Sequence, residues 1–261
     1  MIKFKTKKRI FSLLQGRNLS RFKGEGLDFR EFREYGFNED AKKIDWKISA
    51  KINKPLVKEY DEERELRIII AVFPTPSLHF GIKTLKSEYL RGLIEFLGIE
   101  AIKEDNRVEI ILLEKNPVVF KPTKNIKTHI AYIQTIKNID FLNTRPGDLK
   151  ILNKFKKSLL ILMGDFFEKI DLSYLKHETF VIVLRDIAEE NPPFRGDITL
   201  FDPVKKEDVN VNFTNRDAKK INMYIQKVDK QNFLHFKKLK IPFVKIYTDE
   251  NPIPKLIRLF K

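Results

Sequence analysis

The chain has 261 residues, of which 42% are hydrophobic and 33% are charged, a composition typical of a globular protein rather than a disordered one. It contains no cysteine, which excludes disulfides, thiolate zinc sites, iron–sulfur clusters and a cysteine nucleophile. The formal net charge of +15 favours anionic partners, but the lysines are scattered and no nucleic-acid recognition module accompanies them.

The first 65 residues are polar and mixed, without a sustained apolar period. Lysines followed by apolar residues predict a short surface helix over residues 1–14, because the apolar part is too short for a signal peptide and no cleavage site follows. No apolar run of the sequence approaches the roughly 20 residues that a membrane helix needs. We therefore expect a cytoplasmic protein.

From residue 66 onward, apolar strands alternate with helical patterns. Strands are predicted at residues 66–72, 107–113, 158–163, 179–184, 197–201, 209–213 and 241–247. Helices are predicted around residues 85–97, 125–138 and 218–228. This alternation predicts an α/β fold with a doubly wound, mostly parallel sheet flanked by helices. Ligands of such sheets bind beyond the carboxyl ends of the strands, so we expect a site in the loops after Phe73 and Met163.

The most distinctive residues lie in the first quarter of the chain. They are Gly24, Gly26, Phe29, Arg33, Glu34, Tyr35, Asp45 and Trp46. On these residues the chain resembles the bacterial von Willebrand factor A-like proteins of the DUF58 family. The resemblance implies a von Willebrand factor A-like domain over residues 66–261, preceded by a signature segment over residues 1–65. It also implies a partnership with a MoxR-type AAA+ ATPase.

The aromatic residues of the signature offer large apolar surfaces, so we expect them to pack residues 1–65 onto the sheet domain. Salt bridges that involve Arg33, Glu34, Asp45 and Lys47 are expected to fix this packing. A partner-binding surface is the alternative role of the segment.

The resemblance implies a metal site that this chain retains only in part. In the family the first strand ends in an Asp-x-Ser-x-Ser loop, and a threonine and a later aspartate complete a set of the oxygen ligands that Mg²⁺ prefers. In this chain Phe73 replaces the first aspartate, whereas Thr75 and Ser77 stand at the two serines. Asp165 stands at the later aspartate.

The position of the family threonine falls near Gly147-Asp148-Leu149, with Thr144 as a nearby substitute. We expect a degenerate site without a cofactor, in which Thr75 and Ser77 are turn residues and Asp165 caps a following helix. Binding of Mg²⁺, with Asp148 or another acid as the missing carboxylate, is the alternative.

No catalytic motif is present: the chain has no phosphate-binding P-loop, dinucleotide-binding glycine motif or serine-hydrolase elbow. A hydrolase that uses Ser77 and His79 with Asp165 is a remote alternative. The expected function is a non-catalytic adaptor or chaperone-like partner of the ATPase, acting on a client protein. It would dock without a metal through the loops around residues 75–81, Gly147 and Asp165. The other alternative is a peripheral binder of anionic membrane or nucleic acid through the basic surface.

Overall fold

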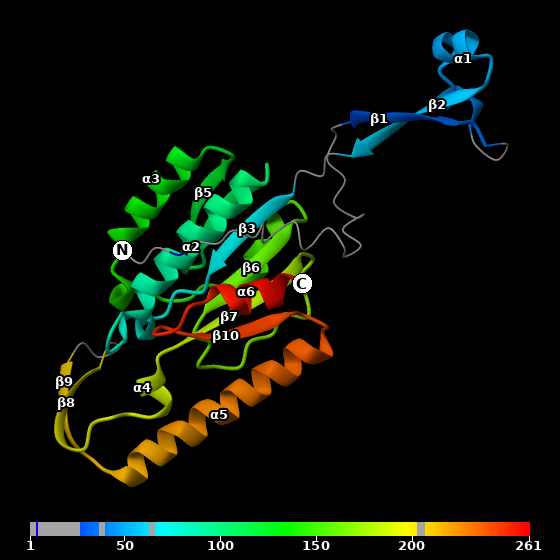
Figure 1. Cartoon of the computed structure of the whole chain (residues 1–261). Coiled ribbons are helices and arrows are strands. Elements are labelled where there is room, and N and C mark those ends of the chain that lie inside the picture. Colours follow the sequence, from blue (N-terminus) through cyan, green and yellow to red (C-terminus); the bar gives the residue numbers. More distant parts are fainter. Residues whose placement is uncertain (1–3, 5–26, 37–39, 63–65, 203–206) are drawn as a thin grey trace. The chain divides into compact units, whose positions relative to one another are not determined.

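The larger unit of the computed structural model is built around a six-stranded sheet with the order β10-β7-β6-β3-β4-β5 (Figure 1). Neighbouring strands run parallel except β5, which is antiparallel to β4. The strands are β3 (Arg67–Val72), β4 (Arg107–Leu112), β5 (Val118–Thr123), β6 (Leu159–Gly164), β7 (Glu178–Arg185) and β10 (Phe243–Tyr247). The predicted α/β fold with a mostly parallel sheet is confirmed.

The structure describes residues 4, 27–36, 40–62, 66–202 and 207–261. The chain divides into two compact units, residues 20–66 on the one hand and residues 1–19 with 67–261 on the other. The predicted division at residue 65 thus differs mainly in the first 19 residues. Of these, the described residue Phe4 packs on the larger unit, with its ring 5.3 Å from that of Tyr89 and 6.0 Å from that of Phe96. The helix expected over residues 1–14 otherwise lies outside the described residues.

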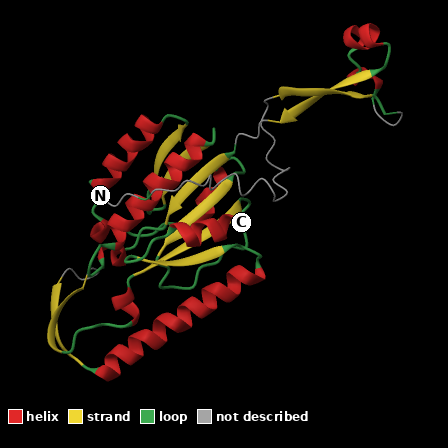
Figure 2. Cartoon of the chain, in the orientation of Figure 1, coloured by secondary structure: helices red, strands yellow, loops and turns green. Residues whose placement is uncertain are grey.

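Helices cover both faces of the six-stranded sheet (Figure 2). They are α2 (Lys86–Lys103), α3 (Ile126–Lys137), α5 (Asn215–Lys238) and α6 (Ile253–Phe260), and the short helix α4 (Ile187–Glu190) follows the end of β7. On one face, Phe236 of α5 packs in a buried cluster with Ile69 of β3 and Leu160 of β6. On the other face, Phe260 of α6 lies 5.2 Å from Phe180 of β7 between ring centroids. Strands covered on both faces are apolar throughout, which explains the unbroken apolar runs in the sequence.

A separate two-stranded hairpin, β8 (Gly196–Asp202) with β9 (Glu207–Phe213), precedes α5 and confirms the two short strands predicted there. Within the part of the chain that the structure describes, every helix is too short or too polar to cross a lipid bilayer.

The smaller unit pairs β1 (Leu27–Glu34) with β2 (Leu56–Glu62) in antiparallel register, and α1 (Trp46–Ile52) lies between them in sequence. Asp45 caps α1 by accepting hydrogen bonds from the backbone N–H groups of Lys47 and Ile48, at 3.1 and 3.2 Å. The same carboxylate lies 2.5 Å from the ammonium of Lys58. The signature residue Asp45 therefore stabilises the unit in which it lies.

Two further signature residues take part in local contacts: the Glu34 carboxylate lies 2.5 Å from the Lys54 ammonium, and the Arg33 guanidinium donates to the Glu34 carbonyl at 3.2 Å. Trp46 is 67% exposed on α1, so packing within its unit does not bury the indole. Gly24 and Gly26 and the side chain of Phe29 lie outside what the structure describes. Packing of this segment onto the sheet domain stays a prediction.

Candidate functional site

Two adjacent parallel strands bring the metal-loop residues to one edge of the sheet. Val72 of β3 pairs with Met163 of β6, and the Phe73 N–H donates to the Met163 carbonyl at 2.8 Å. The loops that begin at Phe73 and Asp165 therefore leave the sheet side by side. This is the carboxyl-end position at which a ligand site was expected.

Asp165 is fully buried, and both of its carboxylate oxygens accept hydrogen bonds from the first loop. Thr75 Oγ1 donates to Oδ1 at 2.8 Å, and Ser77 Oγ donates to Oδ2 at 2.6 Å. The two hydroxyl oxygens are 3.0 Å apart. The structure thus brings together the three residues that the sequence singled out as remnants of a metal site.

The expected role of Asp165 as a helix cap is wrong. Residues 165–177 form a loop without a helix, and Phe166 adopts a left-handed backbone with φ of 41°. The Asp165 side chain points back to the loop at residues 75–77 instead. The sequence also suggested that Asp165 belongs to an exposed docking face. This is wrong for its carboxylate, which is fully buried.

Lys86, the first residue of α2, completes the cluster, and sequence reasoning missed it. Its Nζ lies 2.8 Å from Asp165 Oδ2 and also donates to Glu189 Oε1, in α4. The Lys86 side chain has no exposed surface, and that of Glu189 is 8% exposed. The Lys86 ammonium also lies 4.8 Å from the centre of the Phe167 ring. We name Thr75, Ser77, Lys86, Asp165 and Glu189 the Lys86 cluster.

The pKa values of the two carboxyl groups of the Lys86 cluster are shifted in opposite directions. Burial works against ionisation of Asp165, but the Lys86 ammonium and the Ser77 and Thr75 hydroxyls hold its pKa below the usual range. Burial raises the pKa of Glu189 above its usual range, although Lys86 and the Asp186 N–H oppose this. Asp165 is therefore the principal counter-ion of the buried lysine.

A second set of buried charges supports Asp165 from behind. Arg185, fully buried at the end of β7, donates to the Asp165 carbonyl oxygen and lies 2.5 Å from Asp229 Oδ1 of α5. Lys245 of β10 lies 3.1 Å from Asp229 Oδ2 and 2.7 Å from Glu190 Oε1. The backbone at Asp165 is thus connected through Arg185 and Asp229 to β7, α5 and β10, in addition to the contacts that its side chain makes with the loop at residues 75–77.

The residues present do not fit a divalent metal ion. Phe73 packs its ring 5.6 Å from that of Phe166, so an apolar contact replaces the family carboxylate. Thr144 Oγ1 donates to the Phe141 carbonyl at 2.7 Å, and Asp148 Oδ1 accepts from the Lys150 N–H at 2.8 Å. Both candidates for the missing ligands therefore serve their own local turns. Among the described residues, no group of three or more His, Asp and Glu side chains is arranged to hold a metal.

The arrangement also differs from a hydrolase triad. In such a triad a histidine lies between the nucleophile and the acid. Here the Ser77 hydroxyl contacts the Asp165 carboxylate directly, and His79 is an exposed residue.

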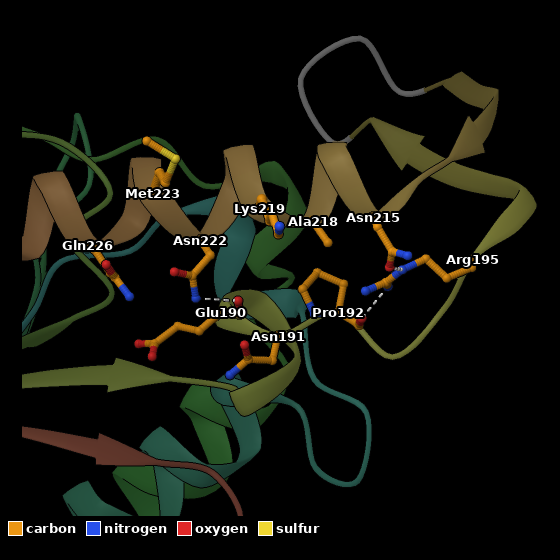
Figure 3. A pocket seen from close by; sticks show the side chains of 10 residues that line it. All are labelled: Glu190, Asn191, Pro192, Arg195, Asn215, Ala218, Lys219, Asn222, Met223 and Gln226. Carbon is orange, nitrogen blue, oxygen red and sulfur yellow. Dashed lines mark hydrogen bonds between the residues drawn. The ribbon is translucent and has the colours of Figure 1, made fainter.

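A polar pocket of about 730 Å³ lies between α4 and the first half of α5 (Figure 3). Its lining consists of Glu190, Asn191, Pro192, Arg195, Asn215, Ala218, Lys219, Asn222, Met223 and Gln226. Asn222 Nδ2 donates to the Glu190 carbonyl at 2.7 Å, and Arg195 Nε donates to Asn215 Oδ1 at 2.6 Å. This pocket was not predicted from the sequence.

Of the two cluster residues that sequence reasoning missed, Glu189 carried a recognisable sequence signal. The spacing from Asp186 to Glu189 is that of a capping box, and both reciprocal bonds of the box are present in α4. Lys86 gave no such signal, because it is one of 51 Lys and Arg residues and stands near the start of a predicted helix.

Comparison with known proteins places these features in a family. The model described as "Protein of unknown function DUF58" matches residues 31–232. The uncharacterized protein Rv1480 of Mycobacterium tuberculosis (strain ATCC 25618 / H37Rv) is 22% identical over 216 residues, which cover 75% of this chain and 67% of that protein. The uncharacterized protein Mb1516 of Mycobacterium bovis has the same identity and coverage.

Two solved structures are similar at lower identity. The conserved hypothetical protein BatB from Bacteroides thetaiotaomicron has a TM-score of 0.46 and 13% identity, over 74% of this chain and 96% of that chain. An aerotolerance-related membrane protein from Bacteroides fragilis NCTC 9343 has a TM-score of 0.44 and 12% identity, with the same coverage of both chains. The match over residues 31–232 covers most of the sequence and confirms the resemblance to the DUF58 family, while the ATPase partnership that the resemblance implies stays a prediction. The chain belongs to the DUF58 family.

Proposed function

We propose that this chain is a non-catalytic protein-interaction module that works in the cytoplasm as an adaptor or chaperone-like partner of a MoxR-type AAA+ ATPase. The observation that carries the proposal is the closed Lys86 cluster. Enzymes with a parallel α/β sheet hold their reactive groups at the carboxyl ends of the strands. In this chain the hydroxyl, carboxylate and ammonium groups at that position bond to one another. The nucleotide-driven work would fall to the ATPase.

Apolar side chains beside the cluster supply a surface for docking. Ile82 and Ile187 are 54% and 53% exposed. Both adjoin Asp186, because the Ile82 N–H lies 3.4 Å from Asp186 Oδ2 and Ile187 directly follows Asp186 in the chain. An exposed apolar pair beside a rigid buried network is suited to a protein contact, which gains from removing apolar surface from water. Such a contact needs no metal ion.

The docking test uses the full chain as bait in native cell extract, with a slowly hydrolysed ATP analogue, at moderate salt, with and without EDTA. The wild-type chain should retain an AAA+ ATPase in both samples. The double variant Ile82→Asp/Ile187→Asp should lose it, because charges would then have to be buried in the contact. Leu234→Asp is the matched control, since Leu234 is 57% exposed near the far end of α5.

Three results would count against this proposal. Retention of the ATPase by the double variant would exclude this surface. Loss of the ATPase with EDTA, under conditions in which the ATPase alone still binds the ATP analogue, would contradict metal-independent docking. Capture of nucleic acid or lipid without an ATPase, lost steeply as salt rises, would favour the basic-surface alternative.

A further inference from the structure

We propose that the Lys86 ammonium is the resident cation of this site and stands in for the metal ion implied by the resemblance to von Willebrand factor A-like proteins. The charge is covalently part of the chain, so the carboxyl edge of the sheet needs no dissociable ion to hold its loops.

The position of Lys86 indicates a specific role for its charge. It is the first residue of an 18-residue helix, where the helix dipole disfavours a positive charge. Its side chain is also fully buried, and an unpaired buried ammonium is strongly unfavourable. Both costs are offset at this position by Asp165 and Glu189, which lie 79 and 103 residues further along the chain.

The ammonium joins two of the three loops that would hold a metal, those after β3 and β6, and it adds α4, which follows β7. It contacts Asp165, which follows β6, and Glu189, which follows β7. Through Asp165 it is coupled to Thr75 and Ser77, which follow β3. An ammonium has three donors, and here two of them are used by carboxylates while the Phe167 ring lies 4.8 Å from the nitrogen.

The same geometry argues against a metal at this position. Mg²⁺ needs near-octahedral oxygen ligands at about 2.0–2.1 Å. The remaining carboxylate of the family set, Asp165, is already bonded to an ammonium 2.8 Å away and to two hydroxyl donors. A second cation on this carboxylate would be repelled by Lys86, and Phe73 supplies no compensating charge.

Metal titration of the wild-type chain tests the proposal directly. We expect EDTA, Mg²⁺ and Mn²⁺ each to leave Tm unchanged within about 1 °C, and titration calorimetry with Mn²⁺ to show no stoichiometric binding. A site saturated a hundredfold above its dissociation constant would raise Tm by about 5 °C or more. A rise of that size, or a fall in Tm with EDTA, would overturn the proposal.

Variants test whether the charge of Lys86 holds the loops. Lys86→Met keeps an unbranched side chain of similar length without the charge, and it should lower Tm by about 10 °C. Lys86→Met/Asp165→Asn should recover part of this loss, because it removes the unpaired carboxylate as well. Lys83→Met is the control, since Lys83 is exposed just before α2, and its Tm should match that of the wild type.

A wild-type Tm for Lys86→Met, or no recovery in the double variant, would contradict the proposed role. If Lys86→Met does not fold, the double variant and the wild-type metal titration still decide the question. These measurements involve no ATPase, so their failure is distinguishable from failure of the proposed function.

Discussion

The two units each contain a short lysine–carboxylate pair, and the two pairs differ in burial rather than in distance. In the smaller unit the Lys54 ammonium lies 2.5 Å from Glu34, with side chains 62% and 68% exposed. In the larger unit the Lys86 ammonium lies 2.8 Å from Asp165, with both side chains 0% exposed. The exposed Lys54–Glu34 pair is slightly shorter than the buried pair, yet water can hydrate both of its charged groups when the contact breaks.

The distance between two opposite charges therefore does not indicate how much the pair contributes to the free energy of folding. An exposed pair exchanges hydration for a contact of similar strength, so its net contribution is small. A buried pair has lost its hydration, so removing one partner leaves the other charge without compensation. The side chains of Asp165, His129 and Lys54 lie at three different points between these limits.

The largest effect is expected for Asp165→Asn, which leaves Lys86 facing the single carboxyl group of Glu189. The free energy of unfolding should fall by about 3 kcal/mol or more. Urea denaturation followed by far-UV circular dichroism measures this loss. Asp171→Asn is the control, because Asp171 lies in the same loop with its side chain 59% exposed. Equal stability of the two variants would show that burial does not set the difference.

An intermediate effect is expected from His129, a buried group to which the described residues supply no counter-ion. Its Nε2–H donates to the Ile94 carbonyl at 3.2 Å, while Nδ1 has no hydrogen-bond partner among the described residues. Burial lowers the pKa of His129, although the hydrogen bond to the Ile94 carbonyl opposes this. Above about pH 6.5 the ring is neutral in both states, so its contribution to stability is fully present.

As the pH falls from about 6.5 toward the lowered native pKa of His129, the unfolded chain binds a proton that the native chain does not. Stability should therefore fall over this window. Urea denaturation at several pH values should show a shallower loss for His129→Gln, whereas His79→Gln should keep the wild-type slope. An unchanged slope in His129→Gln would mean that another group causes the acid sensitivity.

The smallest effect is expected for Lys54→Ala. Hydrogen bonding and charge attraction from Lys54 lower the pKa of Glu34, but both groups are well exposed to solvent. We expect no measurable change in the stability of the smaller unit. Hydrogen exchange of the backbone amides of β1 and β2 measures the stability of this unit. A clear destabilisation by Lys54→Ala would show that exposed pairs contribute more here than the comparison implies.

The sequence predicted the strands that are buried on both faces, and it missed β5 and α6. β3 and β6 read as unbroken apolar runs because helices cover both sides of them. β5 was missed, since it is an edge strand with a proline at Pro122 and four of its six residues exposed. α6 was missed as well, because its 8 residues are too few for a sustained helical period.

By itself, the sequence determined the family, the parallel sheet, and the convergence of Thr75, Ser77 and Asp165, because strand order and motif spacing carry that information. Only the tertiary structure decided what those residues bond. Lys86 and Glu189 are 103 residues apart in the chain, and nothing in the local pattern of either predicts the contact. A buried charge is stabilised by whichever group the fold brings within reach, and that group is set by packing rather than by neighbouring sequence.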